Sequence, residues 1–507
     1  MPLAPFFSNS ASDWTAQPGL YISERNTPGA FVGRLRNSVG VCGECVRGPV
    51  GTPISITDAA YFLSVFGARD QGGPISDGNA TITGLVWQSL LNKKFGEVIV
   101  IRAAAAAAVA ASKALTSTGP VTNLTVTAAN VGVWGNNITV AVEAASNAVS
   151  TSFDLVLTYV GATYRLKNIN INGASDDNTA TVLAEMWPDP YQRLVTLTKG
   201  TAGRPDNAVA AALTSGAAGS IADSDFTGTG GPMEQLAAYA GLKAVWIAER
   251  THSTTLQDKW ETLAASAYDR LFLMGPSAST TTSTDAITNV ASYRYKRIWY
   301  GFNHPKTTDP TTGLNITVRP ESFMASYIAQ TEVDTHPISA KASEAALMGV
   351  KELTNTALTR ATHILLKNAG ITAIDFDQNG IPHFASGVTT SVTTGEEEVV
   401  QRRMRDQIQL DLADLCAPFV GEKNSTSNRS LILSQIGDYL ANKKANESIV
   451  KDYAAPQFIS TSVEEAAGLA KILVRVKTLS HWIYLVIDTA IGPNVSIEES
   501  DTLPVAA

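Results

Sequence analysis

Two cysteines three positions apart, Cys42 and Cys45, form the one CxxC motif of the sequence. Such a pair could form a disulfide, carry out thiol exchange or supply half of a zinc site. The surrounding VGVCGECVRGP predicts a strand that runs into a turn. Residues three apart in a strand lie about 10 Å apart on opposite faces, too far for a disulfide. No second CxxC and no HxxxH motif is present, so we predict two thiols without a bridge or a metal.

Six histidines are the candidate general bases. They are His252, His304, His336, His363, His383 and His481. None lies in an HExxH motif, and no serine lies in a GxSxG motif or in a subtilase-like GTSxA context. We therefore predict that the chain is not an enzyme and needs no cofactor. An α/β hydrolase with a β accessory domain is the alternative from a different functional class.

The loop Gly228-Thr229-Gly230-Gly231 precedes an expected helix and could bind a phosphate through its backbone amides. A Walker loop would continue with Lys and then Ser or Thr, and these residues do not follow. We favour a flexible linker.

Three arginines, Arg402, Arg403 and Arg405, lie within one expected helix, close to Glu396–Glu398 and Asp406. A charge run of this kind is usual on a solvated helix face. The alternative is that the arginines face a complementary charge on a partner protein. Both interpretations stay open, and the three arginines are candidate interface residues.

A chain of 507 residues is too long for one hydrophobic core, so we expect about two to four domains. The formal net charge of −8 argues against nucleic-acid binding, which normally uses a basic surface. No apolar run is long enough to span a bilayer, and the N-terminus lacks the regions of a signal peptide. With three cysteines and no disulfide framework, we predict a reduced, cytoplasmic origin.

Hydrophobic patterns predict an α/β protein with a mostly β insertion. Short apolar runs such as 98–101 and 271–274 predict buried strands, and helical spacing predicts helices at 342–368, 396–416 and 430–444. The expected parts are an N-terminal arm (1–24), an α/β unit that packs with the C-terminal domain (25–103), a β-rich insertion (104–225), a central α/β domain (226–345), an α+β C-terminal domain (346–490) and a tail (491–507).

The segment Lys471–Asp488 contains two different strand patterns. Apolar Ile472, Val474 and Val476 alternate with basic Lys471, Arg475 and Lys477. This alternation predicts a strand with one wet face, whereas the wholly apolar 482–487 predicts a strand buried on both faces. For the second pattern we favour a strand of the chain's own core. For the first we favour pairing with another molecule, with a strand of its own domain as the alternative.

Five segments spread over most of the chain carry a family resemblance. They are PGLYISER, VGVCGECVRGPVGTP, VGVWGNNITVAVE, LLKNAGITAI and GLAKILVRVKTLSHWIYLVID. Together and in this order they resemble contractile phage tail sheath proteins. The resemblance implies a subtilisin-like central domain, an inserted β domain and a C-terminal domain.

Sheath proteins of this kind assemble as stacked six-subunit rings around a tail tube and contract by subunit rotation, without hydrolysing a nucleotide. The resemblance therefore implies a structural subunit of the virion tail, assembled in the host cytoplasm, whose contraction drives the tube through the host envelope for genome ejection. Its implied partners are further copies of itself, the tail tube protein, and baseplate and tail terminator proteins. The sheath of a capsid-less phage-like injection particle is the alternative within this class.

In this family the terminal arms of neighbouring subunits add strands to one another's sheets. The candidates here are 19–24 and 472–478. The expected hinges are Pro18-Gly19 and Pro28-Gly29 at one end, and Gly468 and Gly492-Pro493 at the other. Main-chain hydrogen bonds would supply the affinity, and alternate side chains would set the register. The expected interface residues are Leu20, Tyr21, Ile22, Ile472, Val474 and Val476.

Overall fold

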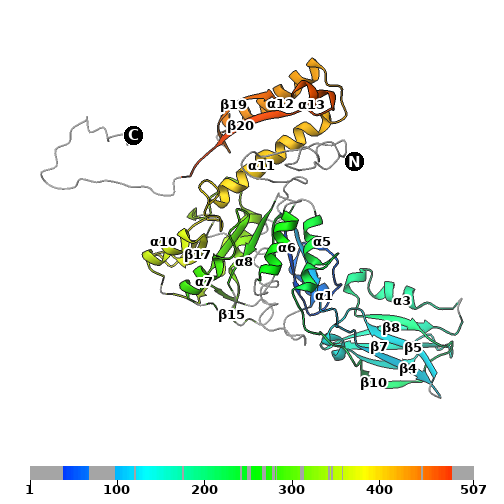
Figure 1. Cartoon of the computed structure of the whole chain (residues 1–507). Helices are drawn as coiled ribbons and strands as arrows, with labels where there is room; N and C mark the ends of the chain where they lie inside the picture. The colour runs from blue at the N-terminus through cyan, green and yellow to red at the C-terminus, as the bar shows by residue number, and fades with distance from the viewer. Residues whose placement is uncertain are drawn as a thin grey trace, which may run out of the picture.

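The computed structural model describes residues 38–67, 97–118, 121–173, 176–239, 242–247, 253–264, 270–276, 280, 282–308, 313, 315–340, 343, 346–356, 358–446 and 449–481. They form a central α/β domain, a β-rich module inserted into it, and a smaller C-terminal unit, which α11 (Val399–Cys416) joins to the centre (Figure 1). No helix of this described part is long and apolar enough to cross a membrane.

An eight-stranded sheet forms the centre of the molecule. In spatial order its strands are β18 (Pro382–Phe384), β17 (Ile371–Phe376), β13 (Ile298–Phe302), β12 (Leu271–Met274), β11 (Leu242–Ile247), β1 (Ser38–Glu44), β3 (Glu97–Ala103) and β2 (Ile54–Ile56). The six middle strands pair in parallel, and β2 and β18 pair antiparallel at the two edges. Parallel strands are buried on both faces, which explains their short continuous apolar runs.

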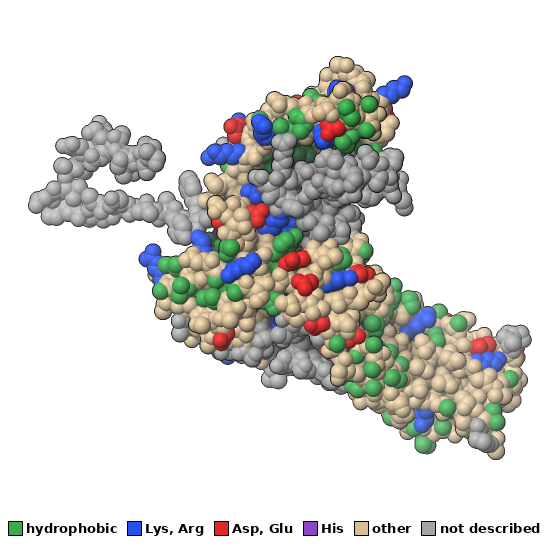
Figure 2. Space-filling view, in the orientation of Figure 1, with side chains coloured by type: hydrophobic (Ala, Val, Ile, Leu, Met, Phe, Trp, Pro, Cys, Tyr) green, Lys and Arg blue, Asp and Glu red, His purple; other side chains and the backbone are tan. Residues whose placement is uncertain are grey.

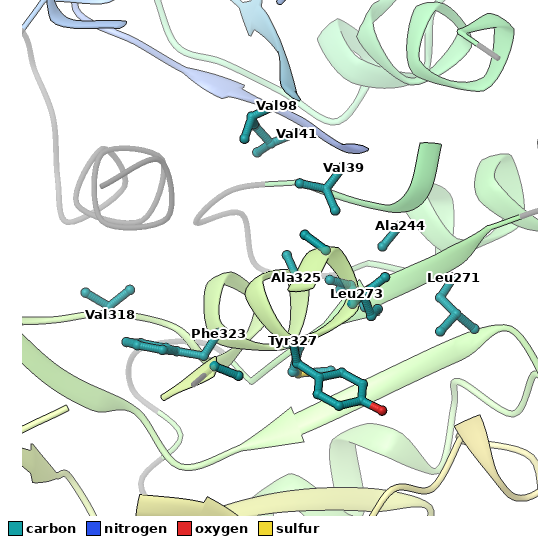
Figure 3. Packing of buried hydrophobic residues seen from close by; sticks show 14 of the residues in the cluster. Val39, Val41, Val98, Ala244, Leu271, Leu273, Val318, Phe323, Ala325 and Tyr327 are labelled. Carbon is teal, nitrogen blue, oxygen red and sulfur yellow. The ribbon is translucent and has the colours of Figure 1, made fainter. Parts of the chain in front are cut away.

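Helices cover both faces of this sheet. One face packs against α1 (Ala59–Phe66) and α8 (Pro320–Gln330). The other packs against α5 (Pro232–Ala238), α6 (Thr254–Ala264), α7 (Ser283–Val290) and α10 (Arg360–Asn368). Residues 320–329 of α8 are all buried, and Figure 3 shows Phe323, Ala325 and Tyr327 of this helix among the strand residues Val39 and Leu273.

Strand β13 and helix α8 approach each other closely at Gly301. A Cβ atom added there would lie 2.8 Å from Cβ of Pro320 and 2.5 Å from Sδ of Met324. We expect Gly301→Ala to lower the free energy of unfolding by about 1–3 kcal/mol, because the rigid proline cannot move aside. Urea denaturation measures this change.

The matched control for Gly301 is Gly437 in α12 (Thr426–Ala445), where an added Cβ meets nothing within 4 Å. Gly437→Ala should keep or raise stability, because alanine is the better helix former. Equal stability of Gly301→Ala and the wild type would contradict the close approach.

The central sheet crosses boundaries that the sequence suggested. Strand β1, from the expected unit 25–103, pairs with β3 of the same unit on one side and with β11, from the expected domain 226–345, on the other. Strand β17, from the expected domain 346–490, pairs with β13. These three stretches therefore share one sheet, and the separate C-terminal unit begins only at α11.

Between β3 and α4 (Ser224–Thr227) the chain forms the β-rich module. Its strands are β4 (Ser112–Ser117), β5 (Val121–Ala128) and β9 (Val195–Lys199) in one sheet, and β10 (Ala208–Ala212), β6 (Thr139–Ala144), β7 (Ser152–Tyr159) and β8 (Ala162–Asn170) in the other. Helix α3 (Thr179–Met186) contributes to the core of this module. Arg102 at the end of β3 donates hydrogen bonds to the backbone oxygens of Cys45, Gly48 and Val131, which fastens the module to the centre.

The helix expected at 342–368 is wrong as one element. Gly349 takes a φ of +85°, which a right-handed helix cannot accommodate. After this break β16 (Glu352–Leu353) pairs with β14 (Pro305–Thr308), which also pairs with β15 (Asn315–Thr317). Helix α10 begins only at Arg360.

The C-terminal unit has its own small core. It consists of α11, α12, β19 (Val450–Phe458), α13 (Ser462–Ala466) and β20 (Ile472–Thr478). Met404 and Ile408 of α11 pack there with Ile436 and Leu440 of α12 and with Val450 of β19.

Candidate functional site

The two cysteines of the CxxC motif are buried and free. Cys42 lies in β1 between Ile247 and Ile101 of the neighbouring strands and has no exposed surface. Burial raises the pKa of the Cys42 thiol and raises that of Cys45 to about 12. Both thiols are therefore protonated at neutral pH and poor nucleophiles. No group of three or more His, Cys, Asp and Glu side chains among the described residues could hold a metal ion.

In α/β enzymes, ligands usually bind beyond the carboxyl ends of the parallel strands. Here the first turn of α8 lies beside Gly275, which follows β12. His304 and Glu321 are buried there, and a Cβ on Gly275 would lie 2.8 Å from a carboxylate oxygen of Glu321. Burial lowers the pKa of His304, whose Nε2 lies 3.4 Å from the backbone oxygen of Pro276. These polar groups are packed within the fold.

The glycine loop 228–231 joins α4 to α5. The amide of Gly230 donates a hydrogen bond of 2.7 Å to Oε2 of Glu234. A carboxylate of the chain therefore occupies a position that a phosphate would need, which agrees with the linker interpretation.

Arg402 is buried, with 3% of its surface exposed, and its Nε donates a 2.9 Å hydrogen bond to Oδ1 of Asp406. The other carboxylate oxygen of Asp406 accepts a 2.7 Å bond from Nη1 of Arg297, at the start of β13. The side chains of Arg297 and Asp406 are 1% and 4% exposed. One buried carboxylate therefore joins α11 to the central domain.

Arg403 is also buried and packs on the ring of Tyr327, with the guanidinium carbon 5.4 Å from the ring centroid. Its Nη2 donates a 2.9 Å bond to the backbone oxygen of Thr331. The expectation that Arg402 and Arg403 face solvent or a partner is wrong, because both bind groups of their own chain. Arg405 is half-buried and stays a candidate interface residue.

Strand β20, which carries Ile472, Val474 and Val476, pairs antiparallel with β19 of the same chain. The side chains of these three residues pack against the small core and remain partly exposed. The two strands form a sheet of their own, and no third described strand pairs with either. The expected strand at 472–478 therefore has one partner within the chain and one open edge.

The backbone direction of β20 follows from the bonds at its two ends. The amide of Ile459 donates to the oxygen of Lys471 (2.9 Å), and the amide of Leu479 donates to the oxygen of Ile449 (3.2 Å). The amide and carbonyl groups of successive residues in a strand point alternately to its two edges. The extra residues of the two bulges lie in β19, so this alternation continues without a break along β20. Ile472, Val474 and Val476 therefore direct their amide and carbonyl groups to the open edge.

Gln401 in the first turn of α11 holds the end of β20. Its Nε2 donates a 2.8 Å bond to the backbone oxygen of Leu479, and its Oε1 accepts a 2.7 Å bond from the hydroxyl of Thr478. The strand is thus attached to the helix that enters the central domain. The expected arm residues Leu20, Tyr21 and Ile22, and the apolar strand at 482–487, lie outside the described residues.

No family model matches the chain, and no curated protein matches it. Solved structures do match over nearly its whole length. The sheath tail protein of Desulfitobacterium hafniense has a TM-score of 0.60 and 15% identity, over 91% of this chain and 100% of that one. The chain has the fold of sheath tail proteins. The Listeria innocua sheath tail protein (TM-score 0.57, 14% identity, 89% and 97% covered) and the PVC sheath complex in the contracted state (0.51, 12%, 94% and 98%) agree.

The resemblance seen in the sequence motifs is therefore confirmed at the level of the fold. The two sheath tail proteins share the mixed α/β architecture with several sheets.

Strand β19, the partner of β20, was not predicted from the sequence. Its sequence contains Pro456 and three charged or amide side chains, so it lacks the alternating apolar pattern that is typical of a strand.

Proposed function

We propose that the protein is the structural subunit of a contractile tail sheath. In this proposal it polymerises as stacked hexameric rings around a tail tube and contracts to drive the tube through the host envelope for genome ejection. The observation that carries the proposal is the full-length match to a sheath tail protein, with 91% and 100% of the two chains covered. The role is mechanical and needs no catalytic residue.

The same proposal assigns partners and a location. The subunit would contact other copies of itself, the tube, the baseplate and the tail terminator, and would be part of the virion after assembly in the host cytoplasm. A structure of the anti-feeding prophage baseplate is among the matching structures (TM-score 0.50, 12% identity). The parallel sheet between two helix layers supports, as a further part of the proposal, a subtilisin-like central domain.

A capsid-less phage-like injection particle is the second candidate, because the PVC sheath of an extracellular contractile injection system also matches. The subunit would perform the same contraction in both particles. The presence of capsid and terminase genes next to the gene for this chain would favour the phage tail.

Purified protein examined by negative-stain electron microscopy tests the proposed function. Tubes with a helical repeat are the expected result. A compact monomer that forms no polymer under any condition would contradict it.

We further propose that the open edge of β20 accepts a strand from a neighbouring subunit. The edge is suited to this because β20 contains no proline and no bulge, and three of its residues direct their backbone groups outward. The opposite edge belongs to β19, which contains Pro456 and both irregularities of the pair. Proline and bulges are typical of strand edges that do not pair further.

A proline at Val474 tests the open edge. Its amide points away from β19, so Val474→Pro should leave the β19–β20 pair intact and remove one donor from the edge. We expect a folded monomer that no longer forms tubes, as judged by circular dichroism and electron microscopy. Val474→Ala, which loses a similar amount of side chain and keeps the amide, should still form tubes. Tubes of normal length from Val474→Pro would contradict strand addition at this edge.

A further inference from the structure

The β19–β20 sheet presents a basic surface on the side opposite its core. Ile472, Val474 and Val476 pack inward, so the alternation of the strand directs Arg475 and Lys477 outward. Both side chains are exposed, and so is that of Lys451 at the start of β19. We name these three residues, Lys451, Arg475 and Lys477, the basic sheet face.

The described part of the chain balances the charges of the basic sheet face only in part, through Asp452, which lies opposite Lys477. No ion pair joins any of the three residues to another described residue. Asp452, the acid opposite Lys477 in the pairing, forms a 2.7 Å ion pair with Lys444. Figure 2 shows several lysine and arginine side chains over this unit. Such a local excess of positive charge contrasts with the net charge of −8 for the whole chain.

An acidic surface lies on the helices of the central domain. Glu234 of α5 and Asp258 and Glu261 of α6 contribute three carboxylates, and Asp258 and Glu261 share one helix face because they are three residues apart. The side chain of Asp258 is exposed. One basic side chain, Lys259, lies among these carboxylates and forms an ion pair with Glu234. We name Glu234, Asp258 and Glu261 the acidic helix patch. Figure 2 shows acidic side chains gathered over α5 and α6.

We propose that the basic sheet face of one copy contacts the acidic helix patch of a second copy of this chain. This inference rests on the proposed function, which requires copies side by side, and adds to it which surfaces meet. Because the two patches occupy different places on the chain, each copy can use both at once. Contacts of this head-to-tail type continue from copy to copy and generate rings or helices, whereas a symmetric contact would stop at a dimer.

The charges would position the open edge of β20 for strand addition. Main-chain bonds alone tolerate a shift of register along a strand. Opposite charges beside the edge fix the approach of the neighbour and reject copies in a wrong orientation. The contact is exposed, so salt should weaken it, since the screening length is about 8 Å at physiological ionic strength.

A different role for Arg475 and Lys477 is to protect the strand edge from non-specific pairing, as lysines on edge strands often do. The sign of the charge separates the two roles. A protective charge works equally well as lysine or as glutamate, whereas a contact with the acidic helix patch requires a positive charge.

Charge reversal on both sides tests the contact. The variants are Arg475→Glu with Lys477→Glu, Asp258→Lys with Glu261→Lys, and the combination of all four substitutions. Each pair alone should lower the polymer recovered by sedimentation by about tenfold, because like charges then face each other. The combined variant should restore polymer, since the two surfaces are complementary again with signs exchanged.

The control is Lys167→Glu, an exposed lysine on β8 at the edge of a sheet in the inserted module, which should polymerise normally. Melting temperatures of the unpolymerised variants report whether they are folded. Wild-type levels of polymer from either reversed pair, or a combined variant no better than the single pairs, would overturn the contact while the proposed function stands. A wild-type chain that forms no polymer would overturn both.

Discussion

Asp406→Ala is expected to lower the free energy of unfolding of the monomer by about 3–5 kcal/mol. The substitution leaves Arg297 and Arg402 buried with like charges and without the carboxylate that both bind. Burial lowers the pKa of Arg297 even though Asp406 beside it acts in the opposite direction, so removal of this carboxylate should disfavour the charged guanidinium further. Urea denaturation followed by tryptophan fluorescence measures the loss, because Trp299 is buried in β13, which begins directly after Arg297.

Two further variants separate the possible causes of this effect. Asp406→Asn keeps the shape of the side chain and removes only the charge, so it should retain most of the destabilisation. Asp414→Ala changes an exposed aspartate of the same helix and should stay within about 0.5 kcal/mol of the wild type. Equal effects of Asp406→Ala and Asp414→Ala would show that the buried ion pair does not stabilise the fold.

The ion pair also explains why helical periodicity identified only half of α11. The apolar stripe of Val400, Met404 and Ile408 was predictable and packs in the C-terminal core. The opposite side of the helix carries Arg402, Arg403 and Asp406, which the sequence suggested to be solvated. In the structure this side packs on the central domain, where Arg297 and Tyr327 supply the partners. When the partner of a buried charge is far away in the sequence, the local sequence pattern is the same as that of a solvent-exposed helix face.

The domain organisation shows the same limit of local patterns. Strands such as β3 and β12 were predictable one by one, because buried parallel strands are short apolar runs. Their arrangement was not, since β1 and β11 are adjacent in the sheet but are separated in sequence by the inserted module. The order of strands in a sheet depends on contacts between distant parts of the chain, and hydrophobic periodicity gives no information about such contacts. For the candidate interface, Ile472, Val474 and Val476 were correctly placed in a strand, and the partner β19 was not foreseen.

Deletion of residues 1–24 is expected to abolish tube formation and to leave a soluble, folded monomer. The described sheets and cores begin at Ser38, so the deletion removes none of their residues. Each main-chain hydrogen bond of an exchanged strand contributes only about 0.5–1.5 kcal/mol net. In a polymer these weak contacts repeat between all neighbouring copies and act together, so their loss should abolish the assembly and not merely weaken it.

A shorter deletion provides the control for the arm. Removal of residues 1–14 retains Leu20, Tyr21 and Ile22, the residues proposed to pair, and should still permit tubes. Electron microscopy and analytical ultracentrifugation measure the polymer, and circular dichroism confirms the fold of both truncated chains. Long tubes from the chain that lacks residues 1–24 would show that the N-terminal strand is not exchanged. Loss of tubes in both truncations would instead place an essential contact within the first 14 residues. Leu20, Tyr21 and Ile22 would then not be sufficient for tube formation.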